Sequence, residues 1–189
     1  MTRAGIDEVG RGPVAGPVVA CALAFRPGAD PALVAMLRDS KALSSARRAA
    51  LAARLPEHAF IGLAAASATA IDRLDIRQAT HLAMRQALAR LERLCPIHID
   101  EIVVDGNESP DHNDPRLRPL VKADAQIPEV SGAAIVAKVL RDRLMERLDR
   151  RWPGYGWAAN AGYPSPAHKA ALLRLGPTPH HRRSFAPVR

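Results

Sequence analysis

Acidic residues stand where apolar runs of the sequence end, and carboxylates in such places can hold metal ions. Asp7 and Glu8 close a short apolar start, Asp105 ends "EIVVD", and Asp124 follows "LRPLVKA". Buried carboxylates are costly unless they are paired or bind a metal, and Mg²⁺ and Mn²⁺ prefer carboxylate oxygens. Any one of these acids alone would be read as a surface or capping residue. Four acids at strand ends favour a metal site, and phosphodiester cleavage commonly uses two such ions about 3.5–4 Å apart.

The segment after the first two acids is rich in glycine. "GRGPVAGP" runs from Gly10 to Pro17, and its glycines let the backbone turn sharply or approach a ligand closely. Because adjacent strand residues point to opposite faces, Asp7 and Glu8 can share one ion only if the strand bends there or a main-chain carbonyl helps. No Lys-Ser/Thr pair follows the glycines, which speaks against a nucleotide-binding P-loop.

Hydrophobic patterning predicts the elements that must position these residues. The predicted strands cover residues 4–8, 17–25, 59–68, 99–105 and 117–124. The predicted helices cover residues 39–56, 75–94, 128–152 and 166–175. Ser44 and Asp75 are expected near the N-caps of the first two helices, and Pro56 is expected to end the first. This order indicates an α/β fold with a mixed five-stranded sheet flanked by helices, whose ligands gather near strand ends.

The whole net charge of +8 lies in the last part of the chain. Residues 138–189 hold 11 Lys and Arg against 3 acids, whereas residues 1–137 hold 16 of each sign. A segregated basic region favours a polyanionic partner such as nucleic acid. A solubilising tail would give the same count, so charge alone leaves both interpretations open.

Length and composition fit one domain with a hydrophobic core. The chain has 189 residues, of which 48% are hydrophobic, and its longest apolar stretch (residues 14–25) is too short to cross a membrane. Cys21 and Cys95 lack CxxC spacing, which favours a reduced, cytoplasmic protein without structural zinc. We therefore expect a single domain over residues 1–189, no membrane partner, and a basic helical portion that binds substrate in about the last 50 residues.

Seven motifs in order along the chain resemble the ribonuclease HII family. They are "DEVGRGPVAGPVV", "DSKALS", "VVDGN", "KADA", "VSGAAIVAKVLRDRLM", "PGYGW…AGYPSPAH" and "HHRRSFAPV", and they run from Gly5 to Val188. The resemblance implies a ribonuclease H-like fold with a helical C-terminal portion. It also implies an endonuclease, dependent on Mg²⁺ or Mn²⁺, that cleaves RNA in RNA/DNA hybrids and ribonucleotides embedded in duplex DNA. The products would carry 3′-hydroxyl and 5′-phosphate ends.

The resemblance also implies roles for single residues. By it, Asp7, Glu8 and Asp105 are metal ligands, and Asp124 is the fourth active-site carboxylate. All four would be catalytic residues. The departures from the family pattern are Ala134 and Leu140, which stand where Ser and Thr are usual.

Substrate contacts follow from the same resemblance. It implies that the main chain at three positions reads the ribose 2′-hydroxyl, and these are Gly10, Arg11 and Gly12. A 2′-hydroxyl both donates and accepts hydrogen bonds, so it is the natural feature that separates RNA from DNA. Ser40 and Lys41 would approach substrate phosphates, and Tyr163 would pack on the sugar beside the junction. Arg11 as a surface partner of a nearby acid, Lys41 as a solvated lysine and Tyr163 as a core residue remain alternatives.

Other residues receive weaker assignments. Arg182, Arg183 and Ser184 belong to a tail motif whose role is anion contact or anchoring. The histidines show no metal-ligand spacing and are treated as ordinary polar residues; the ones considered are His98, His168, His180 and His181.

Two competing hypotheses stand beside a ribonuclease HII-type enzyme. Ribonuclease HIII shares the fold but carries an extra N-terminal substrate-binding domain, for which the six residues before Asp7 leave no room. A binding module without catalysis would not need all four carboxylates. We therefore expect an enzyme that acts as a monomer on RNA/DNA hybrids and on duplex DNA containing ribonucleotides.

Overall fold

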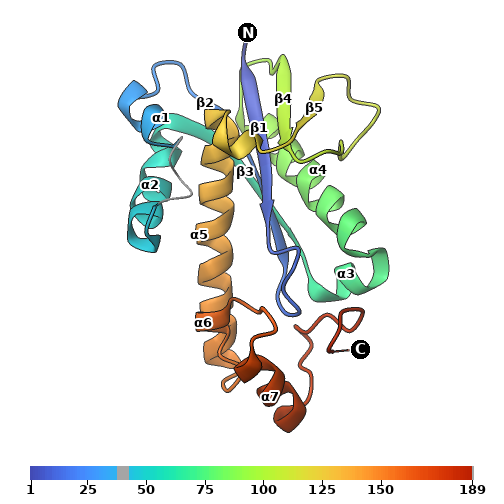
Figure 1. Ribbon diagram of the computed structural model, residues 1–189. Coiled ribbons are helices and arrows are strands. Elements are labelled where there is room, and N and C mark those ends of the chain that lie inside the picture. Colours follow the sequence, from blue (N-terminus) through green and yellow to red (C-terminus); the bar gives the residue numbers. More distant parts are fainter. Residues whose placement is uncertain (38–42, 189) are drawn as a thin grey trace.

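The computed structural model describes residues 1–37 and 43–188, and a five-stranded sheet lies at its centre (Figure 1). Its strands are β1 (Arg3–Val9), β2 (Val18–Phe25), β3 (Ala59–Ala66), β4 (Glu101–Asp105) and β5 (Leu117–Leu120). The order is β3-β2-β1-β4-β5, and β2 pairs antiparallel with both β1 and β3. Because β4 pairs parallel with β1 and with β5, the predicted mixed sheet is confirmed.

Helices surround this sheet. They are α1 (Pro31–Leu37), α2 (Ser45–His58), α3 (Ala68–Leu74), α4 (Ile76–Leu94), α5 (Pro128–Arg151), α6 (Trp157–Asn160) and α7 (Pro166–Leu175), with a 3₁₀ helix, η2, at Ala123–Ala125. The predicted caps are confirmed, since Ser44 Oγ accepts a hydrogen bond from Arg47 N and Asp75 Oδ1 accepts one from Gln78 N. The predicted end at Pro56 is wrong, because α2 continues to His58.

Both faces of the sheet are covered, and strand β2 shows how the sequence achieves this. Even-numbered residues from Val18 to Ala24 pack in one apolar cluster with α4, and odd-numbered residues from Val19 to Leu23 pack in another with α1, α2 and α5. A strand buried on both faces needs a continuous apolar run, which is what β2 has. Figure 1 shows α4 and α5 on opposite sides of the strands.

The long helix α5 extends past the sheet and carries the C-terminal part of the chain (Figure 1). Met145 near its end packs in a cluster with Tyr155, Trp157 and Ala171. The segment after α7 then returns to the end of β1, where Gly16 N donates to the carbonyl of His180. None of the helices in the described residues combines the length and the apolar composition that a membrane crossing needs.

Candidate active site

Two of the four acidic residues lie on neighbouring parallel strands. Asp7 is in β1 and Asp105 ends β4, and the pairing of Ile6 with Val104 places the two acids side by side. Val103 packs with Val130 of α5, whereas Val104 and Ile6 pack on the opposite face with α4. Because successive side chains of a strand point to opposite faces, Asp105 and Asp7 lie on the face that α5 covers. The sheet thus brings these two carboxylates together.

Asp124 reaches the site by a different route from the one predicted. It does not end a fifth strand: β5 stops at Leu120, and Asp124 lies in the 3₁₀ helix η2. The chain turns at Lys122, which has a φ of 59°. Asp105 Oδ1 then accepts hydrogen bonds from the N–H of Ala123 (2.7 Å) and of Asp124 (3.4 Å). Because Asp105 caps this helix, its carboxylate fixes the neighbouring acid close to itself.

Helix α5 holds the same turn from the other side. The hydroxyl of Ser131, which is fully buried, donates to the main-chain carbonyl of Asp124. The sequence motifs gave no signal for this contact, because a serine in a helix usually points to solvent or bonds within its own helix.

Asp7 lies in strongly acidic surroundings. Its side chain is buried, with 8% of the residue exposed. Burial raises the pKa of Asp7 well above its ordinary value, and the charges of Glu8, Asp105 and Asp124 raise it further. Negative charge therefore accumulates around Asp7, and a cation between the carboxylates would stabilise it.

Glu8 leaves β1 on the other face, because β1 pairs regularly with β2 through Val9. Burial raises the pKa of Glu8, and the Arg11 guanidinium, 3.4 Å from Glu8 Oε1, lowers it in part. Within the described residues, Glu8 Oε2 is buried without a hydrogen-bond partner. In residues 1–37 and 43–188, no three His, Cys, Asp or Glu side chains already stand as a ready-made ligand group.

Tyr163 meets the glycine-rich segment that follows β1. We call Gly10–Pro17 the glycine loop. A Cβ atom placed on Gly12 would lie 3.4 Å from Tyr163 Cε1, and Val14 N donates to the carbonyl of Gly162 at 2.9 Å. Tyr163 is 51% exposed, so the alternative of a core residue is wrong. For Arg11, the alternative of a surface pair with an acid is what the structure shows.

Two arginines of the basic C-terminal region lie inside the protein. Arg141 is 1% exposed and Arg182 is 0% exposed, and both lie under the glycine loop. Their neighbour Arg183 is exposed, and its N–H joins that of Ser184 in donating to the carboxylate of Asp72. The tail motif therefore anchors the chain, and Arg182 is its buried part.

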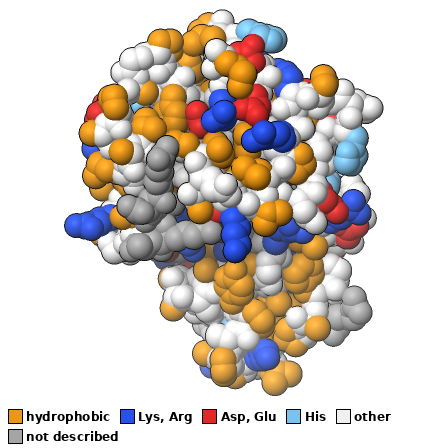
Figure 2. All heavy atoms as spheres, turned by 45° about the horizontal axis from the view of Figure 1, so that its top comes forward, with side chains coloured by type: hydrophobic (Ala, Val, Ile, Leu, Met, Phe, Trp, Pro, Cys, Tyr) orange, Lys and Arg blue, Asp and Glu red, His pale blue; other side chains and the backbone are white. Residues whose placement is uncertain are grey.

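The basic surface is accordingly smaller than the composition indicates. Lys138 pairs with Asp142 at 2.7 Å. Of the ten Lys and Arg residues described from 138 onward, seven are exposed, and these are Arg143, Arg147, Arg150, Arg151, Lys169, Arg174 and Arg183. On the face drawn in Figure 2, Lys and Arg side chains form separate spots and not one continuous patch.

Two histidines treated as ordinary polar residues prove to be buried parts of a hydrogen-bond network. His181 Nδ1 accepts from Thr178 N (2.9 Å), its Nε2 lies 3.1 Å from His168 Nε2, and His168 Nδ1 lies 2.8 Å from the carbonyl of Tyr163. Trp157 Nε1 also donates to His168 Nε2. These bonds require His168 to carry its proton on Nδ1 and donate it to the Tyr163 carbonyl, so the network fixes the turn that carries Tyr163.

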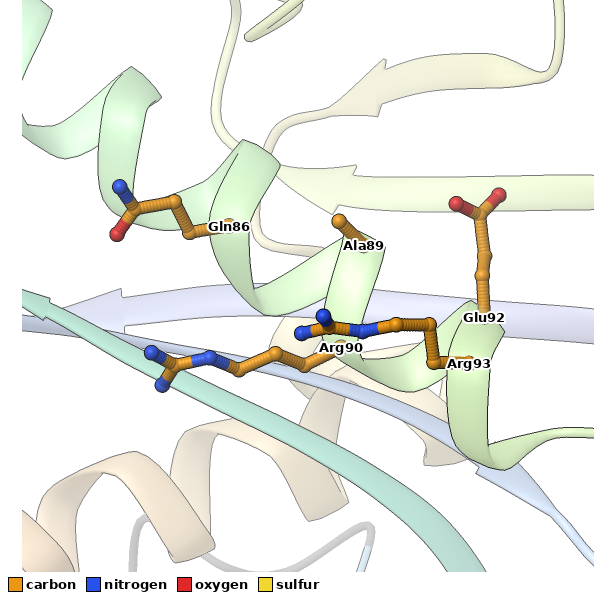
Figure 3. Close-up of a pocket in the computed structure, with 5 residues that line it drawn as sticks. All are labelled: Gln86, Ala89, Arg90, Glu92 and Arg93. Carbon is orange, nitrogen blue, oxygen red and sulfur yellow. The ribbon is translucent and has the colours of Figure 1, made fainter.

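Some residues from the sequence analysis do not join the site. Ser40 and Lys41 lie outside the described residues. Leu140 packs at the edge of the apolar cluster of α1, α2 and α5, and Ala134 is half-buried on the same helix. A surface pocket on α4 also lies apart from the acids (Figure 3). Its lining residues are Gln86, Ala89, Arg90, Glu92 and Arg93.

Comparison with known proteins places this arrangement in a family. The family model described as Ribonuclease HII matches residues 4–188. A ribonuclease HII of Cereibacter sphaeroides (strain ATCC 17029 / ATH 2.4.9) is 51% identical over 184 residues, which cover 97% of this chain and 84% of the relative. The ribonuclease HII of Rhodospirillum rubrum is 52% identical over 189 residues, covering 98% and 84%.

Solved structures agree with this placement. The ribonuclease H2 of Pyrococcus horikoshii OT3 is similar with a TM-score of 0.80 and 28% identity, covering 100% of this chain and 96% of that one. A ribonuclease HIII solved in complex with Mn²⁺ has a TM-score of 0.79 at 21% identity, covering 100% and 68%, and shows likeness of fold alone. The fold is therefore ribonuclease H-like, and the chain belongs to the ribonuclease HII family of ribonuclease H-type endonucleases.

Proposed function

We propose that this endonuclease cleaves RNA in RNA/DNA hybrids and also cuts at single ribonucleotides embedded in duplex DNA. The observation that carries the proposal is the buried Asp7, on which the charges of three other carboxylates act beside a loop and a tyrosine suited to a sugar. Four acids close enough for their charges to act on Asp7 are suited to phosphodiester hydrolysis with divalent ions. The products would have 3′-hydroxyl and 5′-phosphate ends.

The donor set fits Mg²⁺ or Mn²⁺. All four side chains offer carboxylate oxygens, and Glu8 Oε2 is a buried oxygen without a hydrogen-bond partner within the described chain. Asp7, Glu8, Asp105 and Asp124 would hold the ions. When bound, two divalent ions lower the pKa of a water molecule and stabilise the oxygen that leaves.

The reaction is a hydrolysis whose atoms balance without another reactant. A water oxygen forms a bond to phosphorus as the bond from phosphorus to the O3′ of the preceding nucleotide breaks. The O3′ atom takes a proton and becomes the 3′-hydroxyl, and the phosphate stays on the 5′ side of the next nucleotide. In this step Asp105 serves twice, because it offers carboxylate oxygens and also holds Asp124 in place through the N–H groups of η2.

The choice of ribose would come from the glycine loop and Tyr163. Gly12 is exposed and lies next to the exposed ring of Tyr163, so a sugar can contact the main chain and the ring together. A site built around a substrate hydroxyl rejects the analogue without it by roughly 10⁴-fold or more. Exposed arginines of α5 and of the C-terminal portion would contact duplex phosphates, as expected for a basic substrate-binding part of a single domain.

The test compares three duplexes that contain one ribonucleotide, four ribonucleotides or none. The protein is incubated with each in the presence of Mn²⁺, of Mg²⁺ or of a chelator, and the ends of the products are mapped. We expect cleavage of the first two duplexes only with metal, and no cleavage by Asp7→Asn, which should still bind duplex. Appreciable cutting of the all-DNA duplex would refute the role of the 2′-hydroxyl, and binding without cleavage would support the non-catalytic alternative. The molar mass of the same sample, measured by light scattering, would test whether the protein is a monomer.

A further inference from the structure

The guanidinium groups of Arg182 and Arg141, both buried, hold the glycine loop from its inner side. Arg182 donates from Nη2 to the carbonyl of Gly10 (2.5 Å), from Nη1 to that of Arg11 (2.8 Å) and from Nε to that of Gly16 (3.1 Å). Arg141 donates to the carbonyls of Pro17 (3.0 Å), Ala161 (2.9 Å) and Ala15 (3.2 Å). Within the described residues, each of these six bonds goes to a main-chain oxygen.

Burying two guanidinium groups costs free energy, and apolar side chains could fill the same space without this cost. A buried cation loses its hydration, and here no carboxylate replaces that hydration through a direct hydrogen bond among the described residues. Burial lowers the pKa of Arg182, and the charge of Arg141 lowers it further. Only a planar guanidinium offers five N–H donors in a fixed fork, so it can bind three carbonyls at once. The geometry therefore serves the loop that these carbonyls belong to.

Peptide geometry tells which groups of the loop face outward. In a trans peptide the C=O of one residue and the N–H of the next point in opposite directions. Because the carbonyls of Gly10 and Arg11 point to Arg182, the N–H groups of Arg11 and Gly12 point away from it. Arg11 and Gly12 are exposed whereas Gly10 is buried, so these two donors lie on the outer side of the loop.

The two arginines also fix the distance between the loop and Tyr163. Arg141 joins Ala15 to Ala161, and Gly162 accepts hydrogen bonds from Val14 and Ala15. A displacement of either guanidinium would thus change both surfaces that meet a sugar.

We infer that Arg182 is a positioning residue for ribose recognition: through the carbonyls of Gly10 and Arg11 it directs the N–H groups of Arg11 and Gly12 toward the 2′-oxygen. It acts from beneath the loop and does not touch the nucleic acid. The inference rests on the proposed function and adds to it the residue that sets the preference for ribose.

The experiment measures kcat/KM on two duplexes that differ in one sugar, which carries either a 2′-hydroxyl or a 2′-fluorine. The variants are Arg182→Lys, which keeps the charge but loses the fork, and Arg183→Ala, a control that removes an exposed charge one residue away. We expect Arg182→Lys to lower the ratio of the two kcat/KM values at least tenfold, mainly through kcat on the ribose duplex. Arg183→Ala should keep the ratio, because its exposed side chain can contact only phosphates, which are the same in both duplexes, so any loss lowers both rates alike.

A merely structural role predicts a different result, since less folded enzyme lowers both rates equally and leaves the ratio unchanged. An unchanged ratio in folded Arg182→Lys would overturn the inference. If Arg182→Lys does not fold, Phe185→Leu decides, because it keeps Arg182 and removes the ring 5.1 Å from its guanidinium. There we expect a fall of twofold or more, and an unchanged ratio would again overturn the inference. If the unmodified protein cuts no ribose duplex, it is the proposed function that fails.

Discussion

Replacing Gly10 by alanine should destabilise the folded protein through a specific collision. A Cβ atom on Gly10 would lie 2.1 Å from Arg141 Nε, and the residue has a φ of +95°. The left-handed backbone conformation costs an alanine about 1–2 kcal/mol. Displacing Arg141 breaks at least one hydrogen bond from a charged group, which costs a further ~1.5–3 kcal/mol. We therefore expect a loss of about 2.5–5 kcal/mol, or a fall in Tm of about 5–20 °C at ~2–4 °C per kcal/mol.

Two other glycines provide matched controls. Gly28 has a φ of +77°, and no described atom lies within 4 Å of a Cβ placed there, so Gly28→Ala measures the backbone term alone. Gly12 is exposed, and its Cβ would only touch the ring of Tyr163 at 3.4 Å. Gly12→Ala should leave stability within ~0.5 kcal/mol but lower kcat/KM on all RNA-containing duplexes at least tenfold, because the methyl group would occupy the place that we propose for the sugar.

The assay is thermal and urea unfolding followed by circular dichroism, together with cleavage of a duplex with one ribonucleotide. If Gly10→Ala loses no more stability than Gly28→Ala, the contact with Arg141 does not hold the loop. If Gly12→Ala is as active as the unmodified protein, the sugar does not lie between Gly12 and Tyr163.

Further expectations concern pH, the tyrosine and salt. Burial lowers the pKa of His181 from 6.5 to about 4. Between pH 4 and pH 6.5, the unfolded chain therefore binds a proton at this residue that the folded protein does not bind. Stability should be retained above pH 6.5 and fall by up to about 3 kcal/mol as the pH drops to 4, and urea unfolding of His181→Gln should lack this fall. Tyr163→Ala should lower kcat/KM more on a single ribonucleotide than on four, and equal losses would rule out junction reading by its ring. Replacing Arg143, Arg147 and Arg150 together by alanine should reduce the slope of log K against log salt by up to about 2.7, as measured by duplex titration, and an unchanged slope would show that they contact no phosphate.

Much of the sheet could be predicted because its strands are apolar runs with clear ends. The run Pro17–Phe25 became β2 with a shift of one residue, and the acid that ends β4 was placed correctly. Two short helices, α1 and α3, were not predicted. Each has seven residues, which is too few to show a helical period of apolar residues. The error at Asp124 has another cause, because the turn at Lys122 depends on a carboxylate from β4, 17 residues earlier in the chain.

The interior polar groups of the site were the hardest to foresee. Arg141 and Arg182 were counted with the basic surface, since arginine is mostly exposed unless it is paired. Their partners are main-chain carbonyls, which every residue has, so no side-chain pattern signals them. The buried network of His168 and His181 was not predicted for a related reason. The two rings bind each other and a peptide carbonyl, and such contacts need no metal-ligand spacing in the sequence.

The contact of Arg182 with the glycine loop also has a consequence for the order in which the protein is made. Arg182 stands 172 residues after Gly10, so at ~5–20 residues per second the ribosome adds it about 9–34 seconds later. All four acidic residues are already in the growing chain by then. The strands that carry two of them can pair first, whereas the carbonyls of Gly10 and Arg11 gain their guanidinium only when the tail is complete. A nascent chain therefore holds its carboxylates before it holds an ordered glycine loop, and the ribose recognition that we propose for this loop would be among the last features to form.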